Sequence, residues 1–230
     1  MSMKTEIFPS ADQVAEGAAA YIEQLIRETL VRKKSFSMAI SGGRTPWEML
    51  KILSKAPLPW THVNLFQVDE RVAPDGHADR NLTQLFQVIE GSPLVNRLRI
   101  FPMPVMAEDL DTASQDYAKL IHEITEGEGL DLIHLGMGSD GHTASLVPGD
   151  GVLDVTDREV GCTEQLYQGR IRMTLTYPLL NSAKRILWIV TGAEKQEMVQ
   201  RLLKRDTSIP AGSINQANAL LMVDQAAFGN

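Results

Sequence analysis

The fold is decided by Leu130-Asp131-Leu132-Ile133-His134-Leu135, which runs directly into Gly136-Met137-Gly138-Ser139-Asp140-Gly141-His142-Thr143-Ala144-Ser145-Leu146. The first segment is largely apolar and predicts a buried strand. The glycines that follow allow the backbone to turn sharply and to approach a ligand closely. Because α/β folds bind small molecules at the carboxyl ends of their strands, we expect a ligand site here.

An acid and a histidine follow this turn two positions apart, at the expected start of the next helix. His142 can move a proton near neutral pH, and Asp140 can orient the imidazole if its side chain reaches back to the ring. If it does not, Asp140 is free to contact a ligand. The alternative interpretation is structural, with Asp140 capping a glycine-rich turn and His142 an ordinary residue of the first helical turn.

Outward from this segment, helices and strands alternate along the chain. Apolar periodicity predicts helices over residues 11–31, 47–53, 81–89, 110–124 and 193–203. Apolar runs predict strands over residues 36–40, 62–68, 98–101, 130–135, 170–177, 185–191 and 220–223. This alternation predicts an α/β fold of the Rossmann-like kind, with a mainly parallel sheet and helices on both faces. We expect one domain, residues 1–230, with residues 149–169 as an insertion or a mobile flap.

Composition narrows the classes of function. The chain has 230 residues, 43% of them hydrophobic and 22% charged, which allows a sizeable core. Its net charge of −7 and the lack of a basic run argue against a nucleic-acid partner. The single cysteine, Cys162, excludes an internal disulfide framework and any multi-cysteine metal site. His62, His77 and His122 lack the spacing of metal ligands, so we expect no metal site.

The N-terminal residues 1–6 lack the pattern of a secretory signal, and no apolar run approaches the roughly 20 residues that a membrane-spanning helix needs. We therefore expect a cytoplasmic protein without a membrane partner. The sequence leaves open whether it is a monomer or a homodimer.

A second glycine turn, residues 41–46, separates a predicted strand from a predicted helix. Gly42 and Gly43 allow backbone N–H groups to face an anion, and Ser41 and Thr45 add hydroxyl groups. The loop lacks both the Gly-Lys-Ser/Thr ending of a Walker loop and the third glycine of a dinucleotide fingerprint. We therefore expect a phosphate monoester or another small anion, the alternative being a plain capped turn.

Further charged residues fall at strand ends. Asp69 and Arg71 follow a predicted strand. Arg71 can bind a phosphate or carboxylate, and Asp69 can bind hydroxyl groups or move protons. The alternative is that they only form buried ion pairs with Glu70. Arg170 and Arg172 are two residues apart and should share a strand face. Lys195 follows another predicted strand and can add a second phosphate contact. His134 lies within an apolar strand, so we expect it to be a core residue.

Taken together and in this order, these segments resemble the 6-phosphogluconolactonase family, which belongs with the glucosamine-6-phosphate deaminases. The resemblance covers roughly residues 10 to 225 and rests on several ordered motifs. They are Ser-Gly-Gly-x-Thr-Pro at 41–46, Asp69-Glu70-Arg71 with Pro74 and Asn81, the segment 136–146, Arg172-Met173-Thr174-Leu175-Thr176 with Asn181, Thr191-Gly192-x-x-Lys195, and Pro210-Ala211.

Two features favour the lactonase branch of the resemblance. The continuation Thr143-Ala144-Ser145-Leu146-Val147-Pro148 is similar to lactonases, whereas deaminases carry Ile-Ala-Phe-Asn-Glu-Pro with a glutamate that orients the histidine. Arg71 also stands where deaminases place tyrosine. Two departures remain: Arg80 replaces a usual serine, and Tyr167-Gln168-Gly169-Arg170 replaces a Pro-Lys-Pro-like segment, which leaves open whether Arg170 replaces a lost cation.

The resemblance implies a sugar-phosphate isomerase/CoA-transferase-like fold and hydrolysis of 6-phospho-D-glucono-1,5-lactone in the oxidative pentose phosphate route, without a cofactor. His142 is then the general base, Asp140 its orienting acid, and Gly138 a candidate oxyanion donor. The expected substrate and phosphate contacts are Ser41, Gly42, Gly43, Thr45, Asp69, Arg71, Gly138, Arg172 and Lys195. The alternatives are a glucosamine-6-phosphate deaminase or isomerase and a sugar-phosphate sensor without catalytic activity.

Overall fold

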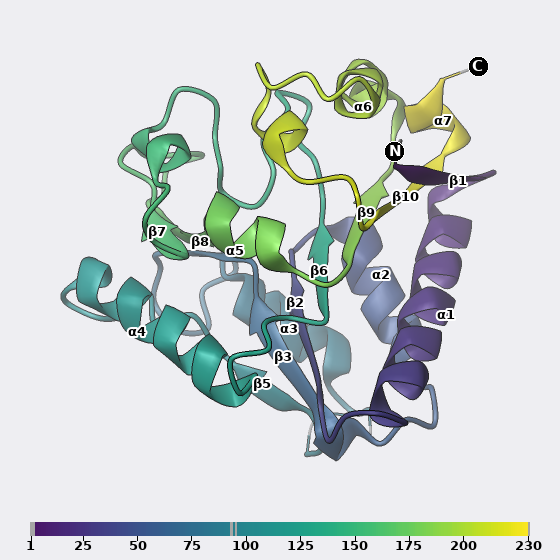
Figure 1. Ribbon diagram of the computed structural model, residues 1–230, viewed down its shortest axis with the longest axis horizontal. Coiled ribbons are helices and arrows are strands. Elements are labelled where there is room, and N and C mark those ends of the chain that lie inside the picture. Colours follow the sequence, from purple (N-terminus) through teal and green to yellow (C-terminus); the bar gives the residue numbers. More distant parts are fainter. Residues whose placement is uncertain (1–2, 93, 95, 230) are drawn as a thin grey trace.

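The computed structural model of the chain describes residues 3–92, 94 and 96–229, so five positions of the expected domain 1–230 lie outside the described residues. Its centre is a seven-stranded sheet in the order β1-β10-β9-β6-β2-β3-β5 (Figure 1). Every pairing in this sheet is parallel. The strands are β1 (Lys4–Phe8), β2 (Phe36–Ile40), β3 (Val63–Gln67), β5 (Arg99–Phe101), β6 (Leu132–Leu135), β9 (Ile186–Val190) and β10 (Ala219–Asp224).

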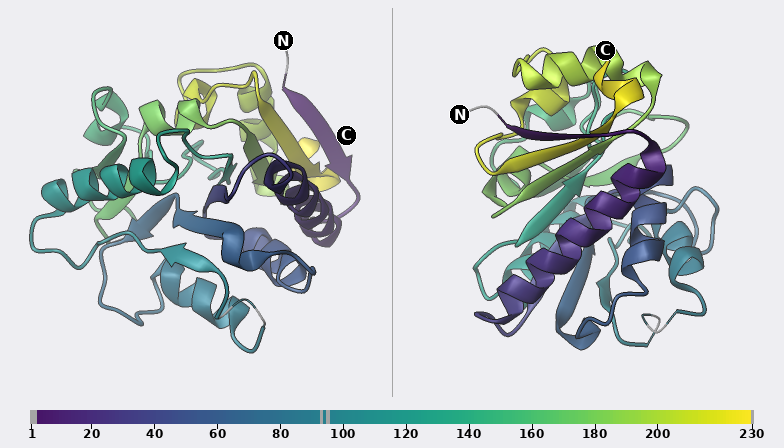
Figure 2. Two further views of the ribbon diagram at one scale, coloured as in Figure 1. Left: turned by 60° about the horizontal axis from the view of Figure 1, so that its bottom comes forward. Right: turned by 90° about the vertical axis from the view of Figure 1, so that its right-hand side faces the viewer.

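Helices cover both faces of this sheet, as Figures 1 and 2 show. One hydrophobic core packs α1 (Ala11–Leu30), α2 (Arg44–Leu53) and α3 (Asn81–Ile89) against one face. A second core packs α4 (Leu110–Ile124), α5 (Tyr177–Ser182), α6 (Gln196–Leu203) and α7 (Gln225–Phe228) against the other. Successive side chains of a strand point to opposite faces, so Met38 of β2 joins the first core and Ala39 the second. The expected α/β class with a mainly parallel sheet is confirmed.

The strand order creates a switch point at the middle of the sheet. From β2 the chain runs outward to β3 and β5, and it then returns to the other side of β2 to form β6. The loops that leave β2 and β6 therefore diverge in opposite directions, which opens a crevice between them at the carboxyl edge. Residues 41–46 and 136–146, the two glycine turns of the sequence, flank this crevice.

A smaller antiparallel sheet lies beside the large one. It contains β4 (Asp69–Arg71), β8 (Arg172–Leu175) and β7 (Val160–Cys162), in that order. Asp69 pairs with Thr174, and Arg71 pairs with Arg172. This sheet brings two of the charged segments of the sequence into register with each other. The remaining short elements are the 3₁₀ turns η1 (Trp60–His62), η2 (Gly151–Asp154), η3 (Ala193–Lys195) and η4 (Pro210–Ser213).

Two of the expectations about secondary structure are wrong, and one strand was not expected. No helix begins within the segment 136–146: Ala144 has a φ of 52°, which a right-handed helix does not allow, and these residues form turns. The strand expected over residues 170–177 is shorter and belongs to the antiparallel sheet. Strand β1 was not expected, because its mixed polar sequence at the sheet edge has no apolar run. Within the described residues, no helix is long and apolar enough to cross a membrane.

Candidate active site

A cavity of about 700 Å³ opens at the carboxyl edge of the large sheet. The turns after β2, β6 and β9 border it, together with residues of β4, β8 and β10. Its lining includes most of the site residues predicted from the sequence: Ser41, Gly42, Gly43, Thr45, Asp69, Arg71, Gly138, His142, Arg172 and Lys195. Asp140 does not line the cavity but contacts His142, which does. The fold thus brings all the predicted residues to one place.

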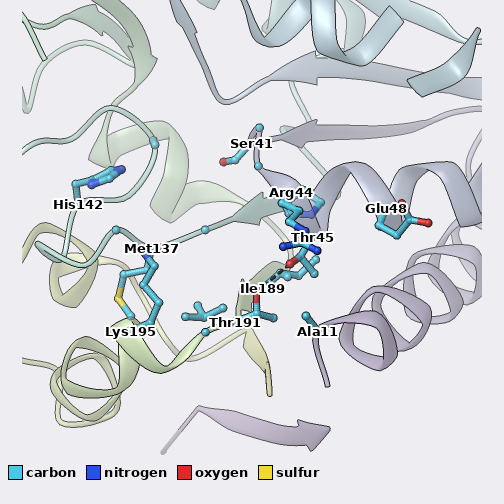
Figure 3. Close-up of a pocket in the computed structure, with 18 of the residues that line it drawn as sticks. Ala11, Ser41, Arg44, Thr45, Glu48, Met137, His142, Ile189, Thr191 and Lys195 are labelled. Atoms are coloured by element: carbon cyan, nitrogen blue, oxygen red, sulfur yellow. Dashed lines mark hydrogen bonds between the residues drawn. The ribbon is translucent and has the colours of Figure 1, made fainter. Parts of the chain in front are cut away.

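The turn at 41–46 depends on its two glycines. Gly43 has a φ of 139°, a conformation that favours glycine. A Cβ atom on Gly42 would lie 2.1 Å from Oδ1 of Asn81, so only glycine allows this close approach. The turn leads into α2, whose N-terminus has no side-chain cap (Figure 3). Its first N–H groups and partial positive charge therefore remain available to an anion in the cavity.

Ser41 is tied to the neighbouring strand rather than free. Its backbone N–H donates to Nδ1 of His134 at 3.2 Å, and its hydroxyl donates to the His134 carbonyl at 3.1 Å. His134 is fully buried, and burial lowers the pKa of its imidazole to about 3. The ring is therefore neutral at physiological pH, as its acceptor role requires. His134 is a core residue that positions the start of the glycine turn, and the Ser41 hydroxyl keeps only its acceptor capacity for a ligand.

Asp140 does reach back to the imidazole of His142. Nδ1 of His142 lies 2.6 Å from Oδ1 of Asp140, which also accepts the backbone N–H of His142 at 3.1 Å. Partial burial raises the pKa of the Asp140 carboxyl, but the hydrogen bond and charge of His142 outweigh it, and the pKa lies below its ordinary value. The ionised carboxylate assigns the ring proton to Nδ1, which leaves a lone pair on Nε2. Nε2 makes no hydrogen bond to any described residue.

Gly138 makes room for this pair. A Cβ atom at position 138 would lie 2.0 Å from Nδ1 of His142 and 2.4 Å from Oδ1 of Asp140. The N–H of Gly138 already donates to the His142 carbonyl at 2.9 Å. The expected role as an oxyanion donor is therefore not available to this group. Gly138 matters because it has no side chain.

Of the three charged residues at 69–71, Glu70 is structural. Its carboxylate is fully buried and accepts the backbone N–H groups of Arg71, Asn81 and Leu82 at 2.8, 2.7 and 2.9 Å. Arg80, the residue that departs from the family pattern, pairs with it at 3.1 Å. Glu70 therefore fixes the N-terminus of α3 to β4. Its two sequence neighbours are left to face the cavity.

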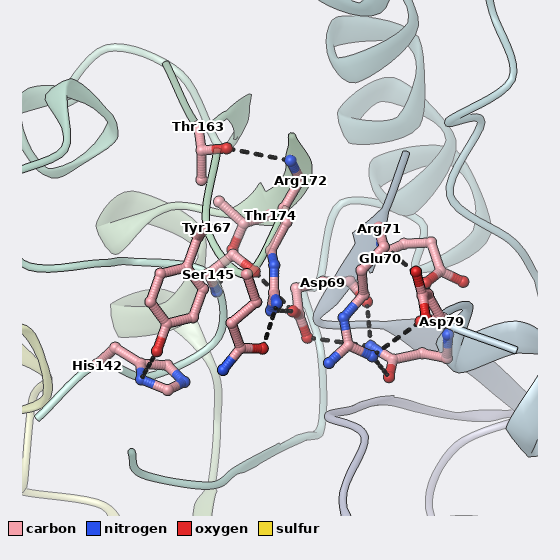
Figure 4. Close-up of polar contacts among 12 residues, drawn as sticks. Asp69, Glu70, Arg71, Asp79, His142, Ser145, Thr163, Tyr167, Arg172 and Thr174 are labelled. Atoms are coloured by element: carbon pink, nitrogen blue, oxygen red, sulfur yellow. Dashed lines mark hydrogen bonds and ion pairs between the residues drawn. The ribbon is translucent and has the colours of Figure 1, made fainter. Parts of the chain in front are cut away.

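Asp69 and the two arginines line the side of the cavity formed by the small sheet (Figure 4). The Ser145 hydroxyl donates to Oδ2 of Asp69 at 2.7 Å, and Nη1 of Arg172 lies 3.9 Å from the same oxygen. Arg71 donates from Nη1 to Oδ1 of Asn81. Burial lowers the pKa of the Arg172 guanidinium, and the charge of Arg71 acts in the same direction. Two cations so close together favour an anionic ligand.

Arg44 and Lys195 also line the cavity (Figure 3), and neither has an ion-pair partner among the described residues. Thr45 and Thr191 join the two turns here through a hydrogen bond of 2.9 Å between their hydroxyls. Arg44 was missed in the sequence, although it lies inside the glycine turn between residues that were chosen. The glycines beside it favour anion binding by backbone groups, and nothing in the sequence of the turn distinguishes the Arg44 side chain from that of a surface arginine.

Arg170 does not share the position of Arg172. It lies at a turn before β8 and pairs with Asp79 at 3.0 Å, outside the cavity lining, so it does not replace a cation there. Tyr167, in the same turn, was noted only as a departure from the family pattern. Its hydroxyl donates to Oδ2 of Asp140 at 3.1 Å and lies 3.2 Å from Nδ1 of His142. No local sequence pattern predicts a contact across 25 residues.

The fold and this cavity define an α/β protein with an acid–histidine pair and an anion-binding turn at the switch point of a parallel sheet. The sequence model of the glucosamine-6-phosphate isomerases/6-phosphogluconolactonase family matches residues 9–223. The chain belongs to this family, and it is an enzyme of it.

Individual relatives favour one branch. The chain is 29% identical over 239 residues to the 6-phosphogluconolactonase of Synechocystis, covering 100% of this chain and 99% of that protein. It is 31% identical over 196 residues to the 6-phosphogluconolactonase of Pseudomonas aeruginosa, covering 83% and 81%. The crystal structure of 6-phosphogluconolactonase from Thermotoga maritima has a TM-score of 0.82 at 26% identity, covering 96% of this chain and 99% of that one.

A monomeric glucosamine-6-phosphate deaminase has the same TM-score of 0.82 at 18% identity, covering 98% of each chain. At that identity the likeness shows the shared fold alone. The fold therefore does not separate the two branches, and the separation depends on the residues of the cavity.

Proposed function

We propose that the chain hydrolyses 6-phospho-D-glucono-1,5-lactone to 6-phospho-D-gluconate, the lactonase step of the oxidative pentose phosphate pathway. The observation that carries this proposal is the 2.6 Å contact from Asp140 to Nδ1 of His142, which leaves the Nε2 lone pair available in a cavity lined by cations. A base in this state can activate water near neutral pH. The relatives named as 6-phosphogluconolactonases support the choice of substrate.

In the first step, a water oxygen forms a bond to the lactone carbonyl carbon while Nε2 of His142 takes one proton from the water. Negative charge develops on the carbonyl oxygen, and Asp140 stabilises the imidazolium that forms. In the second step, the bond from the carbonyl carbon to the ring oxygen breaks, and Nε2 returns its proton to that oxygen. The product is an open-chain hydroxy acid, which ionises to the carboxylate and releases a proton. Positioned proton transfer of this kind contributes about 10²- to 10⁴-fold in rate.

We place the phosphate group at the N-terminus of α2. The N–H groups after Gly42 and Gly43 and the hydroxyl of Thr45 can surround its oxygens, since this helix end has no side-chain cap. Arg44 and Lys195 also line the cavity and can add charge-assisted hydrogen bonds. The substrate then extends from this end toward His142.

The sugar and lactone end meets the small sheet. Asp69 can accept hydrogen bonds from sugar hydroxyls, and Arg71 and Arg172 lie beside it. The guanidinium of Arg172 and the imidazole of His142 both contact the ring of Tyr167. In this arrangement Arg172 therefore lies near the reacting carbonyl. Its charge can stabilise the developing oxyanion, the role that the N–H of Gly138 does not fill.

The test is a comparison of two substrates with the purified protein. Freshly generated 6-phosphogluconolactone is followed by acid release against its spontaneous hydrolysis, and glucosamine-6-phosphate is followed by release of ammonia. We expect acceleration with the lactone alone, because no glutamate follows His142 in the segment 143–148. Ammonia release without lactone hydrolysis would assign the chain to the deaminase branch. Binding without turnover of either substrate would favour a sugar-phosphate sensor.

A further inference from the structure

The hydroxyl of Tyr167 contacts both members of the acid–histidine pair. Figure 4 shows its contact with His142. It donates to Oδ2 of Asp140 at 3.1 Å, while Oδ1 of the same carboxylate faces Nδ1 of His142 at 2.6 Å. The Asp140 side chain is 41% exposed, so the protein holds it by few other contacts. Without the tyrosine, Oδ2 has no donor among the described residues, and only the imidazole and backbone N–H of His142 hold the carboxylate, both through Oδ1. Both oxygens of the carboxylate therefore have a donor only while Tyr167 is in place.

The ring of Tyr167 has a second pair of contacts. The guanidinium of Arg172 lies over the ring face at 4.8 Å from its centroid. The imidazole of His142 meets the ring at 64°, with 5.2 Å between centroids. One side chain therefore contacts both the base and the buried cation beside it. The face-on guanidinium is the favourable geometry for a cation–π contact.

A two-residue turn presents Tyr167 to these partners. Tyr167 and Arg170 exchange backbone hydrogen bonds of 2.9 and 3.3 Å around Gln168 and Gly169, which have φ angles of 52° and 79°. Two positive φ values define a type I′ turn, the form that matches the twist of a hairpin. The Arg170 side chain anchors the turn to Asp79 at 3.0 Å. This is the segment 167–170 that departs from the family pattern.

We propose that Tyr167 is a positioning residue, whose hydroxyl fixes the Asp140 carboxylate and thereby the Nδ1–H tautomer of His142, and whose ring holds Arg172 beside them. The consequence for catalysis rests on the proposed function, whereas the tautomer does not. Burial, followed by the charge of Asp140, raises the pKa of the Tyr167 hydroxyl, so it stays a donor throughout the neutral range.

Two substitutions separate the hydroxyl from the ring. Tyr167→Phe removes the donor and keeps the ring, whereas Tyr167→Leu removes both. For Tyr167→Phe we expect kcat about 10-fold lower with an unchanged KM, which corresponds to one lost hydrogen bond to a charged carboxylate. For Tyr167→Leu we expect the same loss in kcat and a KM about 5-fold higher, because Arg172 loses its platform. The matched control is Tyr177→Phe, which removes a hydroxyl that donates to the Pro210 carbonyl at 3.1 Å outside the cavity lining.

The decisive readout is the protonation of the imidazole and needs no substrate. Nitrogen-15 spectra of the full chain at about pH 8, where imidazoles are neutral, distinguish the two tautomers of each histidine. The His142 signals are assigned by their loss in His142→Ala. We expect Nδ1–H to predominate in the wild type and in Tyr177→Phe, and a mixture of tautomers in Tyr167→Phe.

A Tyr167→Phe spectrum with the wild-type tautomer would overturn the positioning role. So would a kcat equal to that of the wild type in an active enzyme. If the wild type fails to hydrolyse the lactone, the proposed function falls, and the spectra still decide the role of Tyr167.

Discussion

Single atoms decide whether the acid–histidine pair forms. Asp140 and His142 are adjacent to a glycine at position 138 whose missing Cβ leaves the space that the contact needs. The sequence predicted that Asp140 and His142 act as a pair, and the structure brings them into contact. It assigned the wrong reason to Gly138, since only the folded turn shows that the N–H is already bonded to the His142 carbonyl. The sequence did not predict Tyr167, because a contact across the fold leaves no trace in local spacing, and it did not predict Arg44, because its side chain looks like that of a surface arginine.

Gly138→Ala should inactivate the enzyme without unfolding it. The added methyl would lie 2.0 Å from Nδ1 of His142, so the imidazole must leave Asp140. We expect kcat to fall about 100-fold, the lower range of a lost general base. Steady-state kinetics and a thermal unfolding curve check this together. The control is Gly161→Ala, whose methyl would meet Thr176 and Val152 at an ordinary 3.5 and 3.7 Å. Full activity in Gly138→Ala would show that the contact is not needed.

At the scale of elements, two supports hold the cavity walls in place. Glu70 joins β4 to the N-terminus of α3. The short helix η4 supports the turn at 136–146, because the Ala211 N–H donates to the Gly141 carbonyl at 3.0 Å. The sequence predicted α3 and α4 with their observed bounds, because regular apolar spacing marks helices strongly. It predicted a helix after Leu135 where none forms. There, Ser145 hydrogen-bonds to Asp69 instead, so a tertiary contact outweighs local propensity.

Glu70→Ala should destabilise the whole fold. The substitution removes a fully buried carboxylate and leaves the buried Nε of Arg80 and the N–H groups of Asn81 and Leu82 without their partner. We expect the free energy of unfolding to fall by about 3–5 kcal/mol, the usual cost of breaking a buried pair. Denaturant unfolding measures it. The exposed pair of Glu23 with Arg27 is the comparison, and Glu23→Ala should cost no more than about 0.5 kcal/mol. Equal losses in both variants would contradict the role of Glu70.

The turn before η4 predicts a dependence on pH. Ser208, followed by Arg201, lowers the pKa of Asp206 to about 2. A carboxyl group whose pKa is lower in the folded state stabilises the fold above its unfolded pKa of about 3.9, and this contribution is lost as the pH falls through about 2. Asp206→Asn should therefore unfold at a lower temperature than the wild type at neutral pH, and the difference should shrink below about pH 4.

Thermal unfolding at several pH values tests this, with Asp154→Asn as the control. Asp154 is exposed and makes no hydrogen bond to the described residues through its side chain. A difference for Asp206→Asn that is constant between about pH 7 and pH 2 would exclude the linkage.

At the scale of the molecule, the cavity exists because the chain reverses direction around β2. That reversal brings the turns at 41–46 and 136–146 to one crevice, and the small sheet adds Asp69, Arg71 and Arg172 from the side. We propose that the chain acts as one domain, since both sheets contribute to a single site. The sequence predicted the parallel sheet from its alternating elements. It did not predict the second sheet, because three-residue strands such as β4 carry too short a pattern to be distinguished from turns.

The central claim is that His142 is the base of a lactone hydrolysis. The most direct measurement compares the rate of 6-phosphogluconolactone hydrolysis by the wild type and by His142→Ala, with binding of 6-phosphogluconate measured alongside. The control is His62→Ala, an exposed histidine whose Nδ1 lies 3.0 Å from the Lys34 carbonyl. We predict a loss of about 10²- to 10⁴-fold in kcat for His142→Ala, with binding retained and His62→Ala unchanged. A His142→Ala enzyme that keeps the wild-type rate would contradict the account.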